Sequence, residues 1–254
     1  MRQKERKEVI LADLRENKTV RILNLSKKLS VSRETIRKDL SQLEESSVLK
    51  KVHGGAVMDS HSEETDYEKR KRENWDAKVR IAKKALTYIE PGDTLYLDYG
   101  TTILALAQEL AKLDDFPLTI LTNSLPIVNL LLPKQKMTII IPGGITRQNE
   151  ASLYGPFGQK NMNDVFVTLG FFSCGGIDCR AAITNHHIGE GMFSKQMMQH
   201  SQTTFLLADC SKFGNVALNR IADLNQLDVV ITDFKDDGSY REVFTSQGID
   251  IVKA

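Results

Sequence analysis

Apolar residues recur at helical spacing through the first 45 residues, and this pattern predicts three helices. They are expected at 5–15, 22–29 and 32–46. In the third helix, Ile36, Leu40 and Leu43 stand at i, i+4 and i+7, which leaves the opposite face polar. Ser32 can cap this helix, because a serine oxygen accepts a hydrogen bond from an N–H group of the first turn. A strand or small hairpin follows around a pair of glycines, and this order predicts a winged helix-turn-helix.

A different pattern begins at residue 77, where a helix to residue 89 is followed by short apolar runs that alternate with helical ones. The runs predict strands at 94–98, 118–122, 137–141, 164–172, 204–209, 227–232 and 249–252. Helices are expected at 102–112, 124–131, 155–162, 187–199 and 239–246. Strands that alternate with crossover helices form a mainly parallel sheet covered on both faces. The predicted fold class is therefore α/β, with a winged helix-turn-helix at 1–57 and a mainly parallel, open α/β sheet domain at 77–254.

The stretch between the two patterns, residues 58–76, is polar, charged and nearly free of aliphatic side chains. We interpret it as a linker, and its run of charges as a solvated connector rather than a binding site.

The distribution of charge separates the two halves more than the net charge of +1 suggests. Residues 1–57 hold 14 Lys and Arg against 8 Asp and Glu, whereas the remainder holds 20 against 25. A basic segment on an acidic body predicts a module that binds nucleic acid, with an inert charged bundle as the alternative. Three cysteines without a CxxC pair favour a reducing compartment, and no apolar run is long enough to span a bilayer. With no signal peptide expected, we predict a cytoplasmic protein.

The turns that follow the strands are the candidate ligand sites, because open α/β sheets bind ligands beyond the carboxyl ends of their strands. Asp98, Gly100, Thr101 and Thr102 stand at a strand end and a helix start, where free N–H groups and the helix dipole favour a phosphate. Capping of the helix by either threonine explains the same residues equally well. Further strand ends contribute Asn123, Gly143, Gly144, Asp209 and Lys212. The last two can grip hydroxyls and a phosphate, or form a surface ion pair.

Other candidate chemistry is weaker. His186 and His187 lack a third ligand at a recognisable spacing, and Cys174, at the end of an apolar strand, fits a small buried residue better than a nucleophile. Neither a P-loop nor a Gly-x-Ser-x-Gly motif occurs. We therefore expect no metal and no cofactor.

Two motifs near the N-terminus, SRETIRKDL at 32–40 and KVHGGAV at 51–57, resemble the winged-helix signature of DeoR-type bacterial transcriptional repressors. Lys51 stands where arginine is usual. The second half resembles the sensor domain of the same family, which is similar in fold to ribose-5-phosphate isomerase. The motifs that carry this resemblance are DYGTT (98–102), LTN (121–123), PGG (142–144), FSCGGID (172–178), a helix with Glu190 and Lys195, LADCSKFG (207–214) and VITD (230–233). Ala182 departs from the glycine that is usual before Ile-Thr.

The resemblance implies a repressor of a sugar or carbohydrate operon that binds double-stranded operator DNA. The expected DNA-binding residues are Ser32, Arg33, Thr35, Arg37, Lys38, Lys50, Lys51 and His53. Arg33 and Arg37 are the better guanine readers, because a guanidinium can bond O6 and N7 together. Lys50, Lys51 and His53 should reach phosphates, whereas Asp39 should orient a neighbouring arginine or cap locally rather than meet DNA. Sites of this kind are read by dimers, so we expect a homodimer or homotetramer.

The resemblance also implies a phosphorylated sugar effector that alters operator affinity. The expected effector-binding residues are Asp98, Gly100, Thr101, Thr102, Asn123, Gly143, Gly144, Glu190, Lys195, Asp209 and Lys212. Two rival hypotheses remain. The second domain is a sugar-phosphate isomerase regulated by the first, or it is a scaffold without a small ligand that binds a protein partner.

Overall fold

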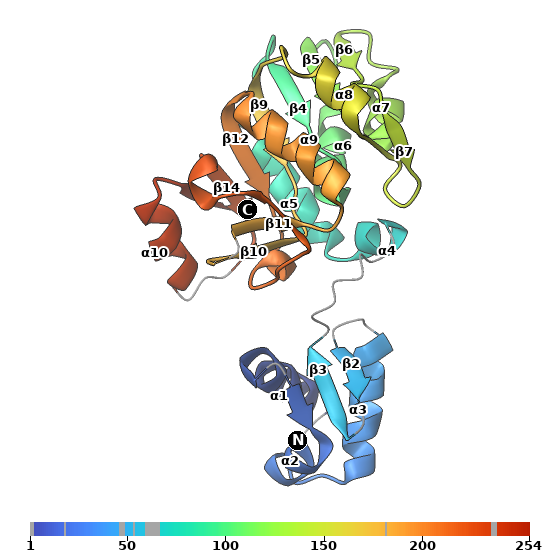
Figure 1. Cartoon of the computed structure of the whole chain (residues 1–254), viewed down its shortest axis with the longest axis vertical. Coiled ribbons are helices and arrows are strands. Elements are labelled where there is room, and N and C mark those ends of the chain that lie inside the picture. The colour runs from blue at the N-terminus through green and yellow to red at the C-terminus, as the bar shows by residue number, and fades with distance from the viewer. Residues whose placement is uncertain are drawn as a thin grey trace. The chain divides into compact units, whose positions relative to one another are not determined.

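The computed structural model divides the chain into two units, residues 1–62 and 63–254 (Figure 1). It describes residues 3–17, 19–45, 49–52, 54–58, 67–180, 182–234 and 238–254. No helix in these ranges is both long and apolar enough to cross a bilayer.

The first unit is the predicted winged helix-turn-helix. Its elements are α1 (Gln3–Asn17), β1 (Thr19–Arg21), α2 (Ile22–Lys28), α3 (Arg33–Glu45), β2 (Leu49–Val52) and β3 (Gly55–Met58). The strands form an antiparallel sheet in the order β1-β3-β2, of which β1 was not predicted. Ile36, Leu40 and Leu43 on α3 are buried against α1 and α2. Gly55 is required here, because a Cβ at this position would lie 2.0 Å from the carbonyl oxygen of Val20.

The second unit is built on a parallel sheet of seven strands, and all seven were predicted. In spatial order they are β15 (Asp250–Lys253), β14 (Val229–Thr232), β12 (Ser201–Leu207), β9 (Val167–Phe172), β4 (Thr94–Leu97), β5 (Leu118–Thr122) and β6 (Met137–Ile140). Because both faces are covered, the strands are apolar runs rather than alternating ones.

Helices cover both faces of this sheet (Figure 1). They are α5 (Trp75–Leu86), α6 (Thr101–Leu110), α7 (Leu125–Leu131), α8 (Pro156–Asn161), α9 (Ile188–Gln199) and α10 (Ser239–Ser246). Ile81 of α5 and Leu106 of α6 belong to one core cluster, whereas Phe193 of α9 and Phe244 of α10 belong to the other. The mainly parallel α/β sheet domain is thereby confirmed.

Short antiparallel elements were missed. A hairpin joins β7 (Ile145–Arg147) to β8 (Ser152–Tyr154), and a second sheet joins β10 (Gly176–Asp178), β11 (Ala182–Asn185) and β13 (Asn219–Ala222). Unlike the strands of the parallel sheet, these short strands are not part of continuous apolar runs in the sequence. Ala182 has a φ of +60°, in the backbone region that favours glycine. This conformation accounts for the glycine that is usual here in the family that the chain resembles.

The predicted linker, residues 58–76, extends too far. Residues Tyr67–Arg72 form α4, and α5 begins at Trp75. Tyr67 is buried in the core of the second unit, and the buried Lys78 Nζ donates a hydrogen bond to the carbonyl oxygen of Arg70. An aromatic side chain therefore docks a segment whose charges indicated solvent. Residues 59–66 of the predicted linker lie outside the described residues.

Candidate functional site

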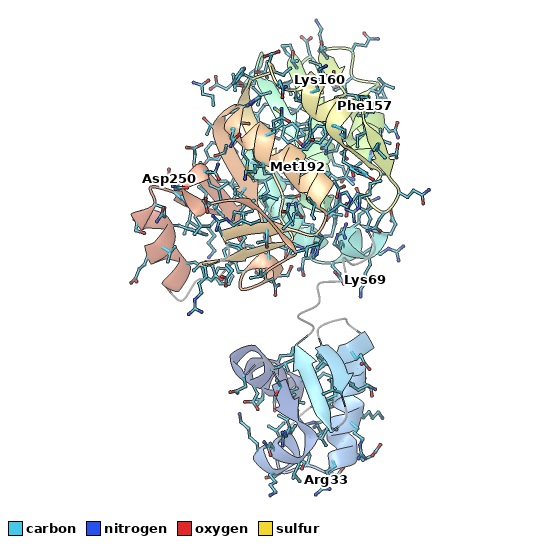
Figure 2. The ribbon with its side chains drawn as sticks, viewed as in Figure 1. Arg33, Lys69, Phe157, Lys160, Met192 and Asp250 are labelled. Carbon is cyan, nitrogen blue, oxygen red and sulfur yellow. The ribbon has the colours of Figure 1, made fainter. Side chains whose placement is uncertain are left out.

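The start of α3 is organised as the sequence predicted. The Oγ of Ser32 accepts a hydrogen bond from the backbone N–H of Thr35 at 3.1 Å, so Ser32 caps the helix. The hydroxyls of these two residues lie 2.9 Å apart. Figure 2 shows Arg33 projecting from the same end of α3, where it is exposed.

A groove runs along α3 beside the hairpin of β2 and β3. Of the predicted DNA-binding residues, it is lined by Ser32, Thr35, Arg37, Lys38 and Lys51. Arg33 does not line it. His53 and the side chain of Lys50 lie outside the described part of the chain.

Two cations of this groove, Arg37 and Lys51, form exposed ion pairs. Arg37 Nη1 lies 2.8 Å from Glu34 Oε2, and Lys51 Nζ lies 3.1 Å from Glu44 Oε2. Exposed pairs contribute little stability, so phosphates can take these cations at low cost. Asp39 is buried and accepts hydrogen bonds from the guanidinium of Arg6. It therefore orients an arginine as expected, although this arginine comes from α1.

A small pocket lies in the second unit at the start of α6. Its lining residues are Arg70, Tyr99, Gly100, Thr101, Thr102, Glu150, Ser173, Cys174, Gly175, Asn185, His186 and Lys212. Gly100, Thr101, Thr102 and Lys212 were predicted from the turns after two strands. The structure brings these turns together at one edge of the parallel sheet.

The start of α6 offers backbone donors to this pocket. Gly100 is the N-cap, with a φ of +108°, and no described side chain caps the helix. The capping role that we considered for Thr101 and Thr102 is therefore not what the structure shows. A Cβ on Gly100 would lie 2.6 Å from the Oγ of Ser173, which donates to the carbonyl oxygen of Tyr99. Free N–H groups at a helix start are suited to bind an anion.

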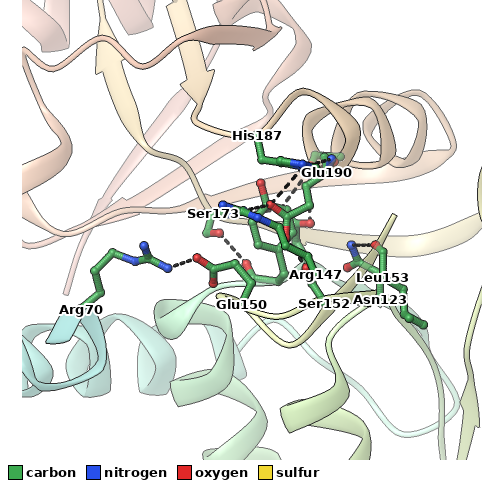
Figure 3. Close-up of polar contacts among 12 residues, drawn as sticks. Arg70, Asn123, Arg147, Glu150, Ser152, Leu153, Ser173, His187 and Glu190 are labelled. Carbon is green, nitrogen blue, oxygen red and sulfur yellow. Dashed lines mark hydrogen bonds and ion pairs between the residues drawn. The ribbon is translucent and has the colours of Figure 1, made fainter. Parts of the chain in front are cut away.

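Charged side chains gather beside the N-terminus of α6. Arg70 of α4 forms an ion pair with Glu150, in the turn between β7 and β8 (Figure 3). Glu150 is 2% exposed, and Lys212 adds a second cation to the lining.

Three buried polar atoms of the lining have no hydrogen-bond partner among the described residues. They are the Oη of Tyr99, the Oε2 of Glu150 and the Nδ2 of Asn185. A buried polar group without a partner costs about 1–3 kcal/mol, and native proteins contain few. Three such atoms in one pocket mark it as a place for a polar ligand.

Asp98 and Asn123 lie behind the pocket rather than in its lining. Burial raises the pKa of Asp98 to about 7, although hydrogen bonds from the Tyr99 amide, Ser194 and Tyr96 lower it. The Oη of Tyr96 lies 3.1 Å from Asp98 Oδ1 and 3.2 Å from Asn123 Oδ1. The amide of Asn123 donates to the carbonyl oxygen of Leu153 at 3.1 Å, which ties β5 to β8. Both residues support the wall.

Glu190 is also a support. Its carboxylate accepts from Arg147 and Ser152, which fastens the β7–β8 hairpin to α9 (Figure 3). Burial raises its pKa, and these two partners oppose the shift. Lys195 is exposed on α9 and does not line the pocket. Gly191 lets α9 approach β13, because a Cβ there would lie 2.4 Å from the side-chain Nδ2 of Asn219.

The remaining predicted residues shape loops. Asp209 accepts hydrogen bonds from the Ser211 amide and from Asn74 Nδ2, each at 3.0 Å. Burial raises its pKa, but the nearby Lys212 ammonium and Ser211 lower it further, and the pKa falls below the ordinary value. Gly144 leaves room for the hairpin, since its Cβ would lie 2.5 Å from the Tyr154 carbonyl oxygen. Neither Asp209 nor the Gly143–Gly144 pair lines the pocket.

Several lining residues were not predicted. Tyr99, Ser173 and Gly175 lie inside the DYGTT and FSCGGID motifs, which could have indicated them. Cys174 is buried as expected, and burial raises its pKa to about 12. No group of three His, Cys, Asp or Glu side chains that could hold a metal occurs in the described ranges.

Two family models match the chain. The model of the DeoR C-terminal sensor domain matches residues 73–234, and the model of the DeoR-like helix-turn-helix domain matches residues 6–62. The chain belongs to the DeoR family. It is therefore a DNA-binding transcriptional regulator.

Relatives match over nearly the whole chain. The HTH-type transcriptional regulator YulB of Bacillus subtilis is 34% identical over 90% of this chain and 88% of its own. The glycerol-3-phosphate regulon repressor of Escherichia coli is 31% identical over 99% of both chains. The lactose phosphotransferase system repressor of Staphylococcus epidermidis is 34% identical over 86% of this chain and 87% of its own.

Among solved structures, ribose 5-phosphate isomerase A of Methanocaldococcus jannaschii is 15% identical, with a TM-score of 0.42 over 55% of each chain. Nothing about activity follows from so slight a likeness. The isomerase hypothesis is set aside, because the matching family and its named members are transcriptional regulators.

Proposed function

We propose that this regulator represses an operon of carbohydrate metabolism, and that a phosphorylated sugar in the α6 pocket changes its affinity for operator DNA. One observation carries the proposal: anion-binding groups and unpartnered polar atoms line the same pocket. The start of α6, Lys212 and Arg70 suit a phosphate, since N–H groups and cations stabilise its charge. Tyr99, Glu150 and Asn185 suit hydroxyls, since an alcohol both donates and accepts.

The names of relatives support the same class of ligand. They include a glycerol-3-phosphate regulon repressor, a lactose phosphotransferase system repressor and an L-fucose operon activator. All three names concern carbohydrates or a phosphorylated three-carbon polyol.

On the DNA side, we propose that α3 enters the major groove of the operator with the residues that line this protein groove. Thr35, Arg37 and Lys38 line it, and Arg33 stands at the end of the helix. One winged helix reads only a short half-site, so we propose that a homodimer or homotetramer binds the operator.

The test is thermal unfolding followed by the fluorescence of Trp75, the single tryptophan of the chain. Glycerol 3-phosphate, ribose 5-phosphate and fructose 6-phosphate are compared with their unphosphorylated forms and with inorganic phosphate. A ligand at 100 times its Kd adds about 2.7 kcal/mol, which raises the Tm by a few degrees.

A matched pair of variants places the binding. Lys212→Gln removes a cation of the lining and should abolish the shift, whereas Lys195→Gln removes an exposed cation and should preserve it. If no phosphorylated compound raises the Tm, or if both variants lose the shift equally, the α6 pocket is not the effector site. The hypothesis of a scaffold for a protein partner would then gain.

A further inference from the structure

Helix α4 is the first described element of the second unit, and three contacts dock it. Tyr67 is buried in the core, the ammonium of Lys78 donates to the carbonyl oxygen of Arg70, and Arg70 pairs with Glu150. The first two contacts join α4 to the body of the unit. The third joins it to a turn that lines the α6 pocket, and both of its members are lining residues.

The Arg70–Glu150 pair is largely withdrawn from water, with side chains that are 14% and 2% exposed. Glu150 uses one oxygen for Arg70, while its Oε2 has no partner among the described residues. The next residue, Ala151, has a φ of +49°, which is strained for a residue with a Cβ. The turn is therefore held in a costly conformation that presents an unsatisfied carboxylate oxygen to the pocket.

The turn itself is firmly fixed. The amide of Leu153 donates to the Asn123 carbonyl oxygen at 2.8 Å, and the amide of Leu125 donates to the Ala151 carbonyl oxygen at 2.9 Å. Glu190 holds the strands on either side of the turn (Figure 3). Glu150 is thus the member of the pair that lies on a fixed element, so a change of partner is expected to act on Arg70 and α4.

We infer that a phosphorylated polyol in the pocket replaces Glu150 as the partner of Arg70, so that occupancy of the pocket alters the docking of α4. The inference rests on the proposed function. A guanidinium binds a phosphate with two parallel hydrogen bonds, as it does a carboxylate. A ligand hydroxyl then donates to the Oε2 of Glu150, so the pocket favours a ligand that carries a phosphate and a hydroxyl together. Helix α4 thereby passes from a contact with the hairpin to a contact with the ligand.

The test measures amide hydrogen exchange of α4 in the full chain, with and without inorganic phosphate or glycerol 3-phosphate at saturating concentration. Without ligand, Glu150→Gln should raise exchange in residues 67–72 about tenfold or more, because Arg70 loses a buried carboxylate. With ligand, the difference from the wild type should disappear, because Arg70 then binds the phosphate in both proteins.

Two further variants serve as controls for this result. Arg72→Gln removes an exposed cation from the same helix and should change exchange in neither state. Arg70→Gln should raise exchange in both states, because neither partner can hold it. The operator affinity of Glu150→Gln without ligand should also move towards that of the liganded wild type.

Equal exchange in Glu150→Gln and Arg72→Gln without ligand would overturn the inference, since the pair would not hold α4. So would an increase that persists with ligand, since Arg70 would not have changed partner. If glycerol 3-phosphate raises the Tm of the wild type beyond the rise with inorganic phosphate, the proposed function stands even when the exchange results contradict the partner change. If neither probe binds, the partner change is contradicted for these ligands, whereas the proposed function fails only if ribose 5-phosphate and fructose 6-phosphate also leave the Tm unchanged.

Discussion

Asp98 is a fully buried carboxyl, and the stability of the second unit should depend on pH because of it. Burial raises its pKa from 3.8 to about 7, against hydrogen bonds from the Tyr99 amide, Ser194 and Tyr96. Below pH 3.8 the group is protonated in both states. Between pH 3.8 and about 7 the folded protein keeps a proton that the unfolded chain has released, so stability falls as pH rises. Above about pH 7 the loss is complete.

The size of this effect follows from the interval. About three pH units at about 1.4 kcal/mol each give a loss of at most about 4 kcal/mol. Asp98→Asn removes the titration while keeping the shape. The new amide can donate to the Oη of Tyr96, which can donate in turn to Asn123 Oδ1. Ser194 can still donate to the remaining carbonyl oxygen, which takes the place of Oδ2. The free energy of unfolding of the variant should therefore rise relative to that of the wild type as pH rises.

The assay is urea unfolding at pH 5, 6, 7 and 8, followed by the fluorescence of Trp75, which reports the second unit alone. Asp114→Asn, at an exposed carboxyl, is the control and should show no change in the difference from the wild type. Burial lowers the pKa of His187. Because this histidine titrates in both the wild type and Asp98→Asn, its contribution cancels in the difference between their stabilities. A constant difference between Asp98→Asn and the wild type from pH 5 to pH 8 would refute the reasoning.

Three further outcomes are expected. Gly100→Ala places a Cβ 2.6 Å from the Oγ of Ser173 and should abolish the ligand-induced rise in Tm, whereas Gly92→Ala, with a φ of +98° and open space, should lose stability alone. Ser32→Ala should destabilise the first unit by about 1 kcal/mol in denaturant unfolding followed by circular dichroism, because the first turn of α3 loses its cap. Arg37→Gln should weaken operator binding by about tenfold in fluorescence anisotropy, and a contact with phosphate would also lower the salt slope by about one; unchanged binding would remove α3 from the interface.

The parallel sheet could be predicted because burial on both faces makes each strand a continuous apolar run. The runs at 118–122 and 227–232 became β5 and β14. The hairpin of β7 and β8 could not, because Ile145 is exposed and the flanking residues are polar. Its place is set by hydrogen bonds to Asn123 and Glu190, which lie far away in the sequence.

The lining residues of the pocket differ in the same way in how far the sequence predicts them. Gly100, Thr101, Thr102 and Lys212 follow strands, and the topology of a parallel sheet brings strand ends together. Glu150 and Asn185 reach the pocket from antiparallel elements whose positions depend on tertiary contacts. Glu190 was placed in the binding set by resemblance alone, and its burial beside Arg147 shows a supporting role.

The sequence does contain a signal for the inward position of Arg70. The stretch YEKRKR of α4 has four consecutive basic residues, and composition alone makes them equivalent. Tyr67, three residues before Arg70, lies on the same helical face, with the guanidinium carbon 6.0 Å from its ring centroid. Burial of the aromatic ring therefore turns Arg70 inwards and leaves Arg72 exposed. A lone aromatic residue in a charged segment, followed by arginine at helical spacing, thus indicates a docked helix that presents one cation to the interior.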